Sequence, residues 1–211
     1  MAGRKPDPKK RVQILHAATD LFSTRDFHTV PVDEVAKAAG CGKGTLYLYF
    51  PTKEHLFYAA ILEALDVLIV ELETAVRGHR GEPALLALAR AACEFFWPRR
   101  HLTVLMQRYE HKQREPEGIE WRARRSRIAA LARQIIEGDA GPRRLGPDES
   151  ALATEMLLAM IRAAVLNHQD RDQPDRAAAL VVDLFLHGLS RTPSRAGRRA
   201  RRPARAAGAR R

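Results

Sequence analysis

The chain has 211 residues, with 36 lysines and arginines against 25 acidic residues, so its formal net charge is +11 at pH 7. It holds no apolar run long enough to cross a bilayer, and its basic start leads into an amphipathic helix rather than a signal-peptide core. Cys41 and Cys93 have no metal-type spacing and form no disulfide framework. We therefore expect a cytoplasmic protein with no membrane segment, metal or cofactor.

The positive charge is concentrated at the two ends of the chain. From Arg191 onward there are nine arginines, no acidic residue and hardly any large apolar residue. Such a segment cannot offset its ordering entropy, so residues 191–211 are expected to form a disordered tail. The tail either raises non-specific DNA affinity by displacing counterions from phosphates, or is solvated and has no partner. Residues 1–10 are expected to form a basic arm.

Almost the whole chain shows apolar residues at helical spacing, and no segment shows a convincing strand pattern. Thr52 is the expected N-cap of a long helix, Pro98 is expected to kink or stop a helix, and Gly188 is expected near a helix C-cap. Residues 138–147 are expected to form a loop. The pattern predicts an all-α fold with helices over residues 8–24, 32–39, 43–50, 53–77, 82–96, 100–113, 117–137, 148–168 and 174–188.

Residues 32–58 are the most informative stretch. Val32, Val35, Ala36 and Ala39 share one face of a short helix that Gly40 ends. The next short helix, KGTLYLYF, carries a cation, a hydroxyl group and two phenols beside an apolar side. Two helices joined by a tight glycine-containing turn are typical of a helix-turn-helix, whose second helix enters the DNA major groove. This stretch therefore predicts DNA binding.

Residues 11–61 resemble the N-terminal domain of the tetracycline-repressor (TetR) family of bacterial transcriptional regulators. The resemblance rests on three segments in register: ILHAATDLF at 14–22, VDEVAKAAG at 32–40, and KGTLYLYFPTKEHL at 43–56. It implies a three-helix DNA-binding domain over residues 11–57, followed by a helical bundle over residues 58–190 for effector binding and dimerisation.

The resemblance also implies the DNA contacts. The segment from Gly42 to Tyr49 would lie in the major groove, where phosphate contacts fix register and a few groups read bases. The tyrosines could instead serve in helix packing. Pro31 departs from the usual serine or threonine, whose hydroxyl caps the helix and often also contacts a phosphate, so Thr29 or the backbone would have to supply the missing cap and DNA contact. The expected base contacts are Lys43, Gly44 and Thr45, and the expected phosphate contacts are Tyr47, Tyr49 and Lys53.

Aromatic and soft apolar residues gather around Pro98, with a few polar residues among them. Such a set fits a cavity for a hydrophobic or amphipathic effector, or it forms ordinary core. The candidate cavity residues are Phe95, Phe96, Trp97, His101, Met106, Tyr109, Trp121 and Asn167.

The last two predicted helices are apolar over more than one narrow stripe, which suggests a partner surface unless they complete the internal core. Two such helices from each of two subunits would form a four-helix interface. The candidate interface residues are Leu152, Met156, Met160, Leu180, Leu184 and Phe185.

Together these features predict a homodimeric, ligand-responsive repressor that binds a near-palindromic double-stranded DNA operator and releases it on binding a small effector. The sequence has no nucleophile, phosphate-loop or acid/base motif of an enzyme. The alternative is a general nucleoid-type protein that binds DNA through its basic tail.

Overall fold

A computed structural model describes residues 7–104, 116–138, 145–167 and 173–188. Within these ranges every regular element is a helix, so the all-α prediction is confirmed. The elements, in chain order, are α1 (Pro8–Thr24), η1 (Phe27–Thr29), α2 (Val32–Ala38), α3 (Lys43–Tyr49), α4 (Lys53–Ala75), α5 (Gly81–Phe96), η2 (Trp97–Arg99), α7 (Pro116–Glu137), α8 (Pro147–Asn167) and α9 (Pro174–His187).

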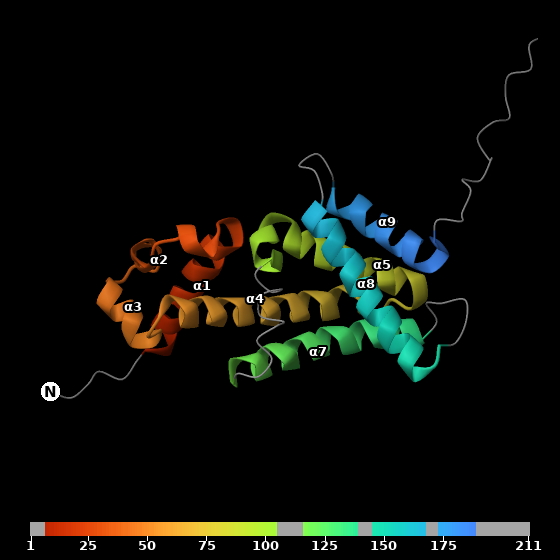
Figure 1. The fold of residues 1–211 in the computed structure, drawn as a ribbon, viewed down its shortest axis with the longest axis horizontal. Helices are drawn as coiled ribbons and strands as arrows, with labels where there is room; N and C mark the ends of the chain where they lie inside the picture. The colour runs from red at the N-terminus through yellow and green to blue at the C-terminus, as the bar shows by residue number, and fades with distance from the viewer. Residues whose placement is uncertain (1–6, 105–115, 139–144, 168–172, 189–211) are drawn as a thin grey trace, which may run out of the picture.

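Helices α1, α2 and α3 form a small unit at one end of the molecule (Figure 1). The Asp7 carboxylate caps α1 by accepting a hydrogen bond from the Lys9 amide at 2.9 Å. Inside the unit, the Phe22 ring meets the Phe57 ring edge-to-face, with 4.9 Å between centroids. The first turns of α4 therefore belong to the core of this unit.

Helix α4 connects the small unit to the rest of the molecule (Figure 1). It begins as predicted, because the Thr52 hydroxyl accepts a hydrogen bond from the His55 amide at 3.2 Å. The expected domain boundary between residues 57 and 58 falls inside α4, so one continuous helix serves both parts of the chain.

The remaining helices form a bundle against the second half of α4. Helix α5 packs on α9, while α7 lies against both α4 and α8. The predicted break at Pro98 is confirmed, since α5 ends at Phe96 and a 3₁₀ turn follows. Helix α9 ends as predicted at Gly188, whose φ of 65° favours glycine.

Three predicted segments lie partly or wholly outside the described residues. Of the helix expected over 100–113, residues 100–104 are helical and the rest is not described. Most of the expected loop at 138–147 and all of the expected tail at 191–211 also fall outside. No helix among the described residues is long and apolar enough to cross a membrane.

Candidate nucleic-acid interface and effector cavity

The turn between α2 and α3 is built by backbone hydrogen bonds around one glycine. Gly40 has a φ of 60°, a conformation that side-chain-bearing residues rarely adopt. The Cys41 amide donates to the Ala36 carbonyl at 2.9 Å, which closes the C-terminus of α2 in the pattern of a Schellman motif. This turn lets α3 leave α2 at a sharp angle and present its outer face.

Helix α3 is held from one side only. Leu46 and Phe50 are 0% and 3% exposed and anchor it in the core, whereas Lys43, Tyr47 and Leu48 are exposed. Gly42 precedes the helix as its N-cap without a side-chain hydrogen bond. A side chain at Gly42 or Gly44 would meet no atom within 4 Å, so the backbone is open to solvent at the start of α3.

The two lysines among the predicted DNA contacts each interact with another side chain of the protein. Lys43 forms an ion pair with Asp33, and Lys53 lies over the aromatic ring of Phe27. The Lys43 ammonium lies 3.1 Å from the Asp33 carboxylate of α2, and both side chains are more than half exposed. The Lys53 ammonium lies 4.4 Å from the centroid of the Phe27 ring, a cation–π arrangement. Partial burial lowers the pKa of Lys53, while Glu54 and Asp26 act in the opposite direction.

The remaining predicted DNA contacts occupy distinct positions. Tyr47 is exposed, Thr45 and Tyr49 are half-buried, and the Tyr49 hydroxyl accepts a hydrogen bond from the Asp7 amide at 2.8 Å. The Thr29 hydroxyl donates to the Asp26 carbonyl at 2.8 Å. Thr29 therefore does not replace the missing cap of α2, whose N-cap residue Pro31 forms no side-chain hydrogen bond.

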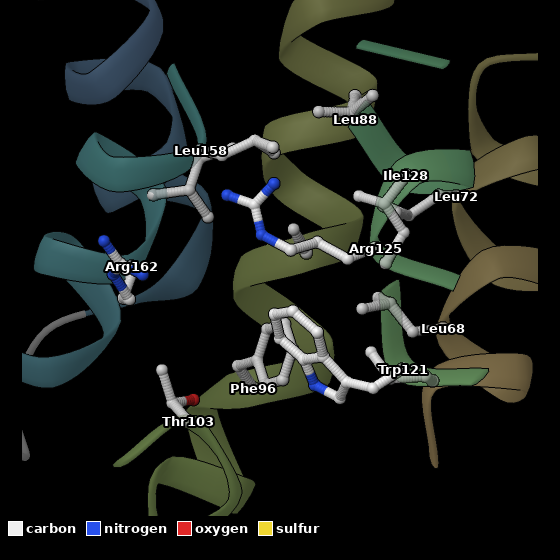
Figure 2. Close-up of a pocket in the computed structure, with 13 residues that line it drawn as sticks. Leu68, Leu72, Leu88, Phe96, Thr103, Trp121, Arg125, Ile128, Leu158 and Arg162 are labelled. Atoms are coloured by element: carbon white, nitrogen blue, oxygen red, sulfur yellow. The ribbon is translucent and has the colours of Figure 1, made fainter. Parts of the chain in front are cut away.

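A cavity of about 130 Å³ lies in the bundle, between α4, α5, α7, α8 and residue 103 (Figure 2). Its lining is mostly aliphatic and aromatic, with two arginines and one threonine hydroxyl. The residues around it are Leu65, Leu68, Leu72, Leu88, Ala92, Phe96, Thr103, Trp121, Arg125, Ile128, Leu158, Ile161 and Arg162.

The predicted cavity residues are divided between several places. Phe96 and Trp121 line the cavity. Trp97 and Asn167 instead line a groove between α8 and α9. Phe95 is buried, with the Arg99 guanidinium 4.5 Å from its ring centroid, and His101 is half-buried. Met106 and Tyr109 lie outside the described residues.

Sequence reasoning missed the polar members of the cavity. Thr103, Arg125 and Arg162 line it, although each stands among ordinary helical residues. For the two arginines, the sequence signal for a position in the cavity is a cation among apolar neighbours on a predicted helix. The cavity leucines of α4 follow the helical spacing of apolar residues seen along most of the chain, and this spacing does not say what a helix face contacts.

The predicted interface residues lie on the outer parts of α8 and α9. Leu152, Met156 and Leu180 are 63%, 54% and 57% exposed, which is unusual for large apolar side chains. Met160, Leu184 and Phe185 are half-buried. Met160, Leu180 and Leu184 border the groove between α8 and α9.

Comparisons with known proteins agree with this arrangement. Residues 14–60 match the family model for bacterial regulatory proteins of the tetR family. An uncharacterised HTH-type transcriptional regulator from Mycobacterium tuberculosis (strain H37Rv) is 28% identical, with 90% of each chain covered. The crystal structure of the TetR-family regulator PfmR from Thermus thermophilus superposes with a TM-score of 0.68 at 25% identity, covering 84% of this chain and 99% of that one.

A further similar structure is the transcriptional regulator FadR from Bacillus subtilis in complex with stearoyl-CoA, with a TM-score of 0.66. It is 18% identical and covers 84% of this chain and 98% of its own, so it supports the fold alone. Residues 14–60 therefore form a DNA-binding domain of the tetR family, and the chain as a whole has the fold of TetR-family transcriptional regulators.

Proposed function

We propose that the protein is a homodimeric repressor that binds a near-palindromic operator through α3 and releases it when a small hydrophobic or amphipathic effector occupies the bundle cavity. The observation that carries the DNA-binding part is the one-sided anchoring of α3. Leu46 and Phe50 fix the helix, and the opposite face offers Lys43, Thr45 and Tyr47 beside open backbone at Gly42 and Gly44.

In this proposal Lys43, Gly44 and Thr45 approach base edges, and Tyr47, Tyr49 and Lys53 contact phosphates on either side. Lys53 is the first residue of α4, so the positive end of that helix adds to its own charge. Two copies of α3 in a dimer would enter successive major grooves about 34–36 Å apart.

The dimer proposal rests on the exposed apolar side chains of α8 and α9 and the groove between these helices. Exposed side chains as large and apolar as Leu152, Met156 and Leu180 favour contact with a partner. Pairing α8 and α9 with their copies would bury them in a four-helix interface.

Two features support a link between the cavity and the DNA-binding unit. Helix α4 carries cavity residues Leu65, Leu68 and Leu72 and, at its first residue, Lys53. The η2 turn follows cavity residue Phe96 directly and packs against α1. An effector that binds better to a conformation with displaced α4 and η2 would shift the population away from the DNA-binding form.

The mostly apolar lining of the cavity supports a hydrophobic or amphipathic effector. The stearoyl-CoA complex of the similar FadR structure is consistent with this class of ligand.

Selection of bound fragments from genomic DNA, followed by fluorescence anisotropy on the selected site, tests the proposal. Tyr47→Phe and Lys53→Met should each weaken operator binding about 5- to 30-fold, since each removes a contact of roughly 1–2 kcal/mol. Arg80→Met, which removes a cation at the start of α5, serves as the matched control and should bind as the wild type does. Unchanged binding by both variants, with folding intact, would contradict the assignment of α3 and α4.

A further inference from the structure

Two buried polar groups of residues that line the cavity have no hydrogen-bond partner among the described residues. Trp121 and Thr103 are each 5% exposed, and neither the Trp121 indole nitrogen nor the Thr103 hydroxyl has a partner among the described residues. Both residues line the cavity. Buried donors without an acceptor are rare in folded proteins, because their hydration is lost without replacement. Both groups belong to residues that line one cavity, so an oxygen acceptor bound there would satisfy both of them.

The charged residues that line the cavity are both cations. Arg125 reaches from α7 toward α8, where Arg162 also lies (Figure 2). Arg125 donates to the Glu155 carboxylate of α8, with Nη1 and Oε1 3.0 Å apart, and the Glu155 side chain is 49% exposed. Glu155 does not line the cavity, so Arg125 and Arg162 supply the charge of the described lining, beside apolar side chains.

A planar guanidinium binds carboxylates and phosphates through two parallel hydrogen bonds. Because Glu155 is half exposed, an incoming anion competes for Arg125 with a carboxylate that water already solvates. The lining thus combines an anion-binding element, an apolar surface formed by the α4 leucines, and two separate hydrogen-bond donors.

We propose that the ligand is a negatively charged amphiphile with a second oxygen on its apolar body; this proposal rests on the proposed effector function. A carboxylate or phosphate head group pairs with Arg162 and Arg125. The apolar body lies along Leu65, Leu68 and Leu72, and the second oxygen accepts hydrogen bonds from Trp121 and Thr103.

Isothermal titration calorimetry with ligands of equal chain length tests the charge. Decanoate or decyl phosphate should bind at least tenfold more tightly than 1-decanol, and the tighter of the two anions identifies the head group. Arg162→Gln and Arg125→Gln should each remove most of this preference. Arg127→Gln, on the same helix but outside the cavity and paired with Glu73, is the matched control and should retain the preference. Equal or tighter binding of 1-decanol to the wild type would overturn the charge assignment.

The second oxygen is tested with decanoates that carry a hydroxyl group at C3 or at C10. At least one of them should bind about fivefold more tightly than decanoate to the wild type, and this gain should disappear in Thr103→Val and Trp121→Phe. Thr103→Val should leave the unliganded protein at least as stable as the wild type, because it replaces an unpaired buried hydroxyl with a methyl group of similar size. No gain from either hydroxyl, or a gain that survives both substitutions, would overturn this part.

Operator affinity measured with and without the tightest of these anions separates the two proposals. Anion binding with the predicted preferences, but without loss of operator affinity, would leave the ligand assignment standing and contradict effector-driven release. If none of the anions binds, while wild-type protein still binds its operator, the ligand assignment is overturned and the DNA-binding proposal stands.

Discussion

The ammonium of Lys43 lies 3.1 Å from the carboxylate of Asp33, so the cation at the start of α3 is paired with α2 before DNA arrives. Both side chains are more than half exposed, and the pair contributes little to stability. We expect a greater effect on binding, because Asp33 places a negative charge beside the surface that we propose for DNA contact.

Asp33→Asn should therefore raise affinity for DNA about two- to fivefold at low salt, chiefly by removing repulsion from phosphates. The plot of log affinity against log salt should become steeper by up to about 0.9, corresponding to one additional counterion released. Fluorescence anisotropy over a salt series measures both effects. Glu71→Gln, which neutralises an exposed acid on α4, is the control and should change neither quantity. If Asp33→Asn leaves both the affinity and the salt slope unaltered, the Asp33–Lys43 pair does not interact electrostatically with the DNA phosphates.

Tyr49 uses its hydroxyl oxygen to accept a hydrogen bond from the Asp7 amide, which leaves its O–H free to donate to a phosphate. Tyr49→Phe should lower operator affinity about 5- to 10-fold, the loss expected for one net hydrogen bond of about 1 kcal/mol. Thermal unfolding should change by only a few degrees. A lower melting temperature with unchanged operator affinity would assign Tyr49 to packing of the α1 N-terminus alone.

Leu180 is 57% exposed on α9 and borders the groove between α8 and α9. If this surface pairs with its copy, Leu180→Glu buries an unpaired carboxylate and should weaken dimerisation by about 2 kcal/mol or more. Light scattering after size exclusion should show a shift from dimer to monomer, and operator affinity should fall with it. The matched control is Val70→Glu, at a residue that is 61% exposed on α4. A wild-type monomer, or a Leu180→Glu dimer of undiminished stability, would contradict the proposed interface.

Cys93 is buried in α5, and burial raises its pKa from 9.0 to about 11. As the pH rises above 9, the unfolded chain loses the thiol proton first. The free energy of unfolding should therefore decrease between pH 9 and 11, by about 1–2 kcal/mol in total. Denaturant titrations over this range measure the change, and Cys93→Ala should remove it.

Labelling of native protein with a thiol reagent at pH 8 should modify the half-exposed Cys41 before the buried Cys93.

Much of the fold could be predicted because its signals are local. The Thr52 cap, the break at Pro98 and the C-terminal stop at Gly188 each depend on one residue and its immediate neighbours, and the structure confirms them. The helical spacing of apolar residues likewise located the helices, although their ends differ by one or two residues.

The cavity could be predicted only in part, because it depends on which helices meet. Phe96 and Trp121 were recognised by their aromatic character, whereas Trp97 was equally aromatic and lies in the groove between α8 and α9. Thr103 gives no signal in the sequence, since only the packed bundle shows that its hydroxyl has no partner within the described part of the chain. Thr29 does not act as a replacement cap, because its hydroxyl donates to the Asp26 carbonyl within its own turn.

One comparison distinguishes sequence reading through α3 from general DNA binding through the basic tail. Affinities for the selected operator and for a scrambled duplex of equal length are measured for the full chain and for a chain lacking residues 191–211. If α3 reads the sequence, the operator should remain at least 100-fold preferred after the deletion, with a shallower salt dependence for both duplexes. Equal affinity for the two duplexes in the full chain, or loss of binding to both on deletion, would contradict it.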